Sequence, residues 1–193
     1  MRVCDWTTVL EFWFGASDAA EFGRPRKLWF EKSAAFDALV RDRFLETYEA
    51  AVGGRLDAWN GRPLGALALV VALDQFPRNM FRGSPRAFAA DPLALAIARG
   101  IVARGFDAAL APAQRTFVYL PFEHAEDLAA QRESLRLFER LAGDALRADL
   151  MTYAMRHYAV IERFGRFPHR NAILGRASTP DEIAFLAQPG SSF

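Results

Sequence analysis

The stretch PLGALALVVAL, residues 63–73, decides the fold. It is apolar on almost every side, which is typical of a helix buried at the centre of a protein. Pro63 fits the first turn of a helix, because the backbone N–H that proline lacks would have no helical partner there. We therefore predict a central, buried helix that runs from Pro63 to Leu73.

Composition and capping residues favour helices along the rest of the chain. Val, Ile and Thr make up only 20 of the 193 residues, while Ala, Leu, Arg and Glu are abundant, and this mixture disfavours strands. The other predicted helices are a short one capped by Asp5 and ending at Gly15, then 34–52 capped by Ser33 and closed by Gly53, 91 to about 105, 113–120, 121–141, 145–164 and 180–187. No linker divides the sequence, so we expect one all-helical domain over residues 1–193.

Charge and cysteine content exclude several classes of partner. The chain has 24 basic and 23 acidic residues, and its formal charge of +1 gives no net field to attract nucleic acid or an anionic membrane. No apolar run approaches the ~20 residues that a membrane-spanning helix needs. Cys4 is the only cysteine, which excludes an internal disulfide and a thiolate zinc cage. We expect a cytoplasmic protein without a nucleic-acid or membrane partner.

Three predicted helices each place a polar or ionisable side chain on an inward face. His124 lies on the apolar stripe of the first long C-terminal helix, and His157 lies on that of the second. The central helix ends its own stripe on Asp74. Burial of so many polar groups is costly, and binding sites are where such costs are tolerated. The alternative for each residue is structural: a core histidine bonded to the backbone, or a buried acid paired with an arginine.

Two acids flank His124. Glu123 and Asp127 are one turn apart in the first turns of the predicted helix over 121–141, where the helix dipole favours carboxylates. They are either ordinary capping residues or partners of His124. Because histidine titrates near neutral pH and an adjacent acid can orient it, His124 beside Glu123 is our choice of general base. The candidate catalytic residues are therefore His124, Glu123 and Asp127.

Two loops that begin with Phe-Pro add arginines and amides. The residue before a proline avoids helical backbone, so we expect the preceding helices to stop at Phe76 and at Phe167. If the loops converge, their guanidinium and amide groups would suit a carboxylate or phosphate; the alternative is ion pairing within ordinary loops. The candidate ligand-binding residues are Asp74, Arg78, Asn79, Arg82, His157, His169, Arg170 and Asn171.

Named catalytic and metal-binding motifs are absent from the sequence. It contains no His-Glu-x-x-His, P-loop, Gly-x-Gly-x-x-Gly or Gly-x-Ser-x-Gly. Its three histidines could meet only through tertiary folding. We therefore assign no metal site and no cofactor.

Several segments carry a family resemblance. They are LDQFPRNMFRG (73–83), YLPFEHAEDL (119–128), RFGRFPHRN (163–171) and PGSSF (189–193), together with residues 9–15. With these segments the sequence resembles the bacterial domain-of-unknown-function 924 family over essentially the whole chain. The resemblance implies a tetratricopeptide-like superhelix of paired antiparallel helices without recognisable repeats, and it implies no established activity.

Two hypotheses about function follow. The first is a polar pocket that binds a small anionic molecule, with or without catalysis. The second is a tetratricopeptide-like scaffold that holds a protein or peptide partner in its groove. Under the first hypothesis, His124→Ala and Arg170→Ala abolish ligand binding and leave the thermal stability nearly unchanged or raised.

Overall fold

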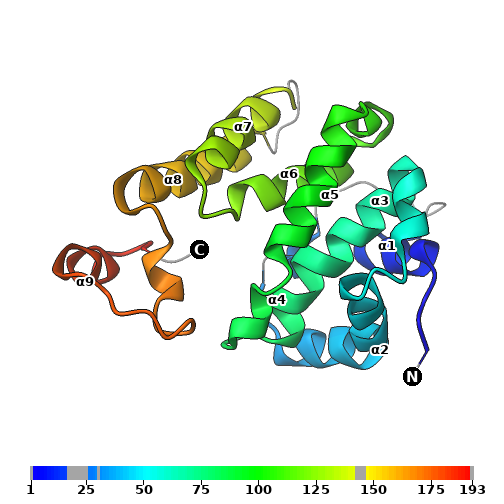
Figure 1. The fold of residues 1–193 in the computed structure, drawn as a ribbon, viewed down its shortest axis with the longest axis horizontal. Coiled ribbons are helices and arrows are strands. Elements are labelled where there is room, and N and C mark those ends of the chain that lie inside the picture. Colours follow the sequence, from blue (N-terminus) through cyan, green and yellow to red (C-terminus); the bar gives the residue numbers. More distant parts are fainter. Residues whose placement is uncertain (1, 17–25, 30, 142–146, 192–193) are drawn as a thin grey trace. The chain divides into compact units, whose positions relative to one another are not determined.

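All regular structure in the described residues, 2–16, 26–29, 31–141 and 147–191 of a computed structural model, is helical (Figure 1). The all-helical prediction is therefore confirmed. The α-helices are α1 (Trp6–Phe14), α2 (Ala34–Val52), α3 (Pro63–Val70), α4 (Phe76–Met80), α5 (Asp91–Ala103), α6 (Pro112–Glu123), α7 (Leu128–Glu139), α8 (Arg147–Phe164) and α9 (Pro180–Leu186). The shorter helical turns are η1 (Lys27–Trp29), η2 (Asp57–Gly61), η3 (Val71–Gln75), η4 (Pro85–Ala87), η5 (Phe106–Ala109) and η6 (Pro168–Arg170).

The chain divides into two compact units. Unit 1 contains Met1–Arg82 and Arg86–Pro121, and unit 2 contains Gly83–Pro85 and Phe122–Phe193. All tryptophans of the sequence fall in unit 1 and all histidines fall in unit 2. The superhelix of paired helices stays a prediction.

Capping side chains start the helices that the sequence predicted most closely. Asp5 Oδ1 accepts the N–H of Thr8 at 2.8 Å at the start of α1, and Ser33 Oγ accepts the N–H of Phe36 at 3.3 Å at the start of α2. Thr179 begins α9 with a complete capping box. Each of these contacts satisfies a backbone donor that the first helical turn leaves without a partner.

The predicted central helix is the buried centre of unit 1. Residues Ala66 to Leu73 are at most 2% exposed, and α3 packs against α1 and α5. Aromatic rings fill the space around it, with centroids 5.6 Å apart for Trp13 and Phe117 and 4.6 Å apart for Phe44 and Phe76.

The helix does not stop at Phe76, so that prediction is wrong. The chain passes from α3 through a π-helical turn, η3, directly into α4, and the N–H of Phe76 donates to the oxygen of Val71. Pro77 has no N–H to give to a regular helix, but the wider turn places it in the first turn of α4, where none is needed. The π turn thus carries the helix past the proline and buries Asp74.

In unit 2, α7 and α8 pack side by side (Figure 1). The hydrophobic core contains Val160, Ile161 and Phe167. The buried face of α8 includes Ala154 and His157, and the burial of His157 was predicted from the apolar stripe. Tyr153 belongs to the same predicted stripe but is 51% exposed. The first two residues of the predicted helix over 145–164 lie outside the described residues.

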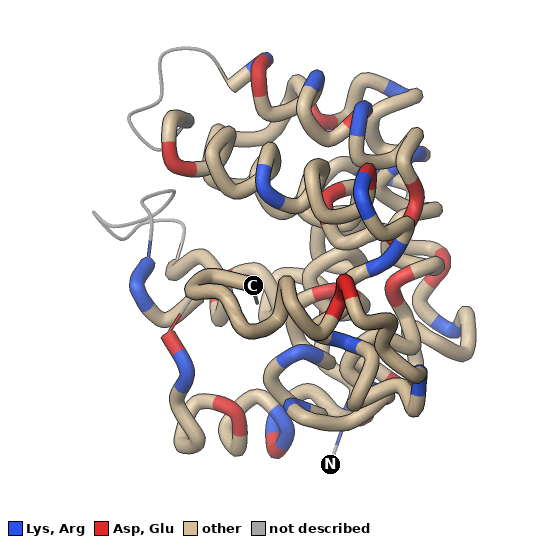
Figure 2. The backbone as a smooth tube through the Cα atoms, turned by 90° about the vertical axis from the view of Figure 1, so that its left-hand side faces the viewer, with Lys and Arg blue, Asp and Glu red and all other residues tan. Residues whose placement is uncertain are grey.

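No helix in the part of the chain that the structure describes combines the length and apolarity needed to cross a bilayer. Basic and acidic residues are interspersed along the backbone (Figure 2), in agreement with the formal charge of +1.

Candidate functional site

The three histidines of the chain meet in unit 2. His124 follows the end of α6, His157 lies in the middle of α8 and His169 lies in η6. The ring centroids of His124 and His157 are 6.4 Å apart. Phe167 lies against His157 and His169, and its ring centroid is 5.5 Å from that of His157 and 5.6 Å from that of His169. Folding thus brings together imidazoles from three separate segments.

Glu123 orients His157. The Nδ1 atom of His157 lies 2.9 Å from the backbone oxygen of Tyr153 and 3.1 Å from Oε1 of Glu123. Both neighbours are acceptors, so Nδ1 carries the hydrogen and Nε2 holds the lone pair of the neutral ring. Burial lowers the pKa of His157 to about 3, against the hydrogen bond to Tyr153. The ring is therefore neutral at pH 7 in a fixed tautomer, ready to accept a proton at Nε2.

Gln131 holds the turn from which Glu123 and His124 project. Its Nε2 donates to the backbone oxygens of Glu123 at 2.6 Å and of Ala125 at 2.8 Å, at the end of α6, where helical carbonyls run out of partners. Gln131 is fully buried, and neither its Oε1 nor the Oγ of Ser134 has a hydrogen-bond partner among the described residues. Each such buried oxygen costs about 1–3 kcal/mol, a cost that is tolerated at binding sites.

Asp127 begins a helix, which corrects the predicted single helix over 121–141. The chain leaves the helix between α6 and α7, and Asp127 Oδ1 accepts the N–H of Ala130 at 2.7 Å as the N-cap of α7. An aspartate favours such a cap over a position inside a helix. Glu123 consequently ends one helix and Asp127 caps the next, so the two acids do not share one helical turn.

Glu126 and Arg176 join the turn after α6 to the segment around η6. Arg176 donates from Nη1 and Nη2 to the two carboxylate oxygens of Glu126 at 2.6 and 2.8 Å, and the N–H of Phe167 donates to the same carboxylate at 2.7 Å. Burial opposes ionisation, but these hydrogen bonds prevail and lower the pKa of Glu126. The sequence analysis missed this pair, since no pattern links charges 50 positions apart.

Arg170 brings a positive charge to the histidines. It is only 6% exposed, and its Cζ lies 4.5 Å from the centroid of the Phe167 ring. Burial, and then the charge of Arg170, lower the pKa of His169 to about 4. His169 is partly exposed, as is His124, so both can meet a ligand from solvent.

The side chain of Asn171 forms hydrogen bonds within unit 2. Its Nδ2 donates to Ser178 Oγ at 3.0 Å and to Glu182 Oε2 at 3.2 Å, and its Oδ1 accepts from Arg176 Nε at 2.9 Å. Arg166 reaches the same Glu182 at 2.6 and 2.8 Å. These bonds fix the segment that carries His169 and Arg170.

Asp74 and Arg78 form an ion-pair network inside unit 1. Asp74 is fully buried, accepts from Gln75 Nε2 at 2.5 Å and lies 3.2 Å from Arg78 Nη1. Arg78 also donates from both terminal nitrogens to Asp91, at 2.8 and 3.0 Å. Both side chains thus have partners within unit 1, and their part in ligand binding stays a prediction.

Arg82 and Asn79 have partners of the same kind. Arg82 donates to both oxygens of Asp37 at 2.7 and 2.8 Å, and its Nη2 lies 3.3 Å from Asn79 Oδ1. Asn79 Nδ2 donates to the backbone oxygen of Gln75 at 3.1 Å. The predicted anion clamp of unit 1 is therefore already bound to carboxylate and backbone groups of unit 1, and its role toward a ligand stays a prediction as well.

No group of three or more potential metal ligands stands close enough to hold an ion in the described part of the chain. The side chains of the histidine group are a carboxylate-oriented imidazole, two further imidazoles and a guanidinium.

The chain belongs to a family of bacterial proteins of unknown function (DUF924), whose model matches residues 9–190. A solved structure of a protein of unknown function from Agrobacterium tumefaciens is similar to it, with 42% sequence identity and a TM-score of 0.82, over 94% of this chain and 96% of that chain. No curated protein matches the chain. The family resemblance in the sequence is confirmed, and neither the family nor the solved relative comes with a described activity.

Proposed function

We propose that the histidine cluster of unit 2, defined as His124, His157, His169 and Arg170, binds a small anionic molecule. The observation that carries the proposal is the convergence of all three histidines of the chain on Phe167 and its neighbours, together with a nearly buried arginine. Burying the Arg170 guanidinium is costly, because its charge is taken out of water and it disfavours protonation of the imidazoles beside it. A bound anion would offset that charge.

The charges of the cluster define the ligand. Arg170 is permanently charged, and after burial its field is a further cause that lowers the pKa of His157 and of His169. A carboxylate or phosphate beside it would offset this field and raise both pKa values. Anion binding should therefore take up protons and become tighter as the pH falls toward the raised pKa values.

If the site is catalytic, the contact between Glu123 and His157 favours His157 over His124 as the base. A carboxylate that accepts the Nδ1 hydrogen fixes the tautomer and stabilises the imidazolium that forms when Nε2 takes a proton. His157 is 5% exposed, so the proton would come from a bound molecule and not from bulk water. His124 and His169 would then contact the ligand. We further infer that the protein works in the cytoplasm, since its single cysteine suits a reducing compartment.

The test is an NMR titration of the imidazole signals, which are few enough to assign with one His→Gln variant each. Inorganic phosphate and citrate are the probes, with chloride at matched ionic strength as the reference. We expect the signals of His124 and His169 to shift with a saturable dependence on at least one probe, and Arg170→Gln to weaken the binding at least about tenfold.

Arg132→Gln is the matched control, because Arg132 is an exposed arginine on α7. It should bind the probe like the parent protein. Unchanged imidazole signals with both probes, or equal affinity in Arg170→Gln and the parent, would contradict the proposal. The alternative scaffold function predicts a different result: a stoichiometric protein or peptide partner whose binding survives Arg170→Gln.

A further inference from the structure

A hollow lies on unit 2, lined by other residues than the histidine cluster. It measures about 240 Å³ and is lined by Arg156, Ala159, Val160, Arg163, Phe164, Phe185 and Gly190. Five of these residues form one face of α8, and Phe185 faces them from α9. The rings of Phe164 and Phe185 have centroids 5.2 Å apart and give the hollow an aromatic wall.

The far wall is held in place by the turn after α9. Arg156 Nη2 donates to the backbone oxygen of Gly190 at 2.6 Å, and Ser191 Oγ donates to the oxygen of Leu186 at 3.0 Å. Gly190 has φ +74°, and a Cβ there would come within 2.7 Å of Arg156 Nη2. The positive φ favours glycine at this turn, where the backbone closes against the guanidinium of Arg156.

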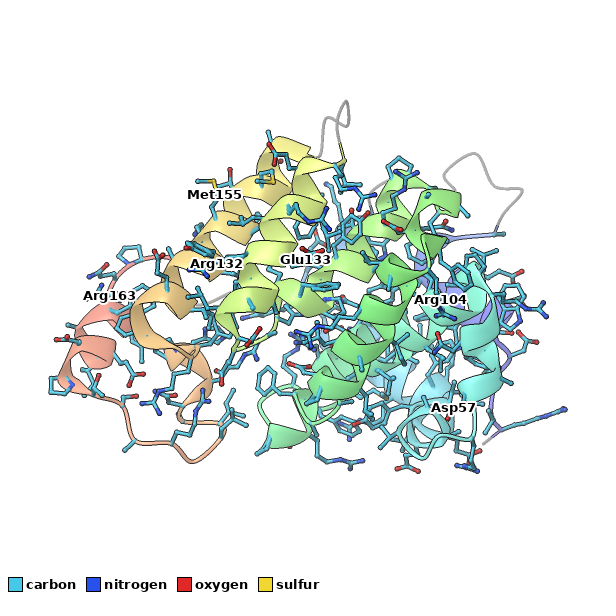
Figure 3. All side chains as sticks on the ribbon, turned by 45° about the horizontal axis from the view of Figure 1, so that its top comes forward. Asp57, Arg104, Arg132, Glu133, Met155 and Arg163 are labelled. Atoms are coloured by element: carbon cyan, nitrogen blue, oxygen red, sulfur yellow. The ribbon has the colours of Figure 1, made fainter. Side chains whose placement is uncertain are left out.

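The charge on the rim has one sign. Among the described residues, two arginines line the hollow and no acidic residue does. Arg163 is exposed, rests 4.6 Å above the centroid of Phe164 and has no carboxylate partner among the described residues. Figure 3 shows Arg163 near the end of α8 and Arg132 on α7. An apolar floor below a guanidinium is complementary to a molecule with an apolar body and a single negative end.

We propose that this hollow binds a small monocarboxylate that carries one aromatic ring. The size supports this class of ligand, because a cavity of about 150 Å³ suffices for benzene and the remaining volume accommodates a short chain. The ring would pack against the aromatic wall of Phe164 and Phe185, and the carboxylate would accept hydrogen bonds from Arg163. This proposal does not depend on the histidine cluster.

The experiment is a calorimetric titration of the full chain with 3-phenylpropionate, with the neutral 3-phenylpropanol as the matched ligand. We expect the acid to bind and the alcohol to bind at least about tenfold more weakly, since it lacks the charge-assisted contact. Arg163→Gln should weaken the binding of the acid by a similar factor and leave the binding of the alcohol unchanged. Arg132→Gln, an exposed arginine on α7, should match the parent protein.

A filling variant tests the location. Ala159 is exposed and lines the hollow, so Ala159→Phe should block the ligand while the circular dichroism spectrum and Tm stay those of the parent. The proposal is overturned by any of three results: no binding of the acid, equal binding of acid and alcohol, or unchanged binding in Ala159→Phe. Imidazole NMR signals that shift with the acid while Arg163→Gln has no effect would place the ligand at the histidine cluster and also overturn it.

Discussion

Two opposing influences act on the protonation of His157. The Glu123 carboxylate at 3.1 Å favours the protonated ring, whereas burial and the charges around it favour the neutral one. Burial prevails and lowers the pKa to about 3. The balance matters for function, because a neutral ring can accept a proton and a protonated ring cannot.

We predict that the imidazole signals of His157 do not titrate between pH 8 and pH 5. The pKa of the folded state lies below the unfolded value near 6.5, so the unfolded chain binds more protons between the two values. The stabilisation is thus complete above pH 6.5 and is lost as the pH falls toward 3; between pH 7 and pH 5 the loss is about 2 kcal/mol. NMR gives the pKa, and urea unfolding of His157→Gln at both pH values gives the free energy. A midpoint near neutral pH would show that Glu123 prevails instead.

Some residues of the site follow from helical periodicity and others do not. His157 was predicted on a buried face because its neighbours on α8 are apolar at helical spacing, and it is buried. The adjacent His124 was predicted as a partner of Glu123, which stays a prediction, and the structure brings Glu123 within 3.1 Å of His157 on another helix as well. Adjacent positions are visible in a sequence, whereas contacts between helices depend on how the helices pack.

Helix ends were predictable where a side chain caps the helix. Asp5, Ser33 and Thr179 each bond the first turn, and the three helices begin where expected. Two predicted helix boundaries were wrong for one reason. Phe76-Pro77 and Pro121 were both taken as helix boundaries, yet α3 continues through a π turn and α6 continues through Pro121. Proline constrains the backbone locally, but the surrounding packing decides whether the helix ends there.

Two helical glycines should respond oppositely to alanine. In α3 a Cβ on Gly65 would overlap the backbone oxygen of Trp59, which cannot easily move, so Gly65→Ala should lower the free energy of unfolding by about 1–3 kcal/mol. In α5 a Cβ on Gly100 meets only Arg104 Nη2 at 3.6 Å, so Gly100→Ala should raise it by about 0.5–1 kcal/mol. Urea unfolding measures both. A stabilising Gly65→Ala would contradict the packing of η2 on α3.

Asp127 separates a capping role from a catalytic one. If it serves only as the N-cap of α7, Asp127→Asn should keep both the stability and the phosphate or citrate binding, because asparagine caps equally well. Asp127→Ala should lower the free energy of unfolding by about 1 kcal/mol. Unfolding and the NMR titration provide the two measurements. If Asp127→Asn keeps its stability but loses ligand binding, the charge of Asp127 takes part in the site.

At the scale of the whole molecule, the two compact units carry different spectroscopic probes. Tryptophan fluorescence reports on unit 1 and imidazole NMR signals report on unit 2, because each residue type is confined to one unit. The prediction of a single domain can be tested in this way. Coincident unfolding transitions from the two probes indicate one cooperative domain, and separate transitions indicate two.

Mild acid should act through unit 2. Between pH 7 and pH 5 the carboxylates stay ionised in the unfolded chain, so histidine is the residue that gains protons on unfolding. Burial lowers the pKa of His157 to about 3 and that of His169 to about 4. We predict that the urea midpoint seen by NMR falls from pH 7 to pH 5, and that His157→Gln combined with His169→Gln removes most of this fall. An equal fall in the double variant would place the acid-sensitive groups elsewhere.

The π turn of η3 also gives the chain one residue more than a regular helix would need between Val70 and Phe76. Deletion of one residue here would leave the span of a regular helix, in which Pro77 would lack the N–H that the helix needs and its ring would meet the carbonyl four positions earlier. In evolutionary terms, deletions should be rarer in this short segment than in any surface loop, because its extra residue lets the helix continue past a proline.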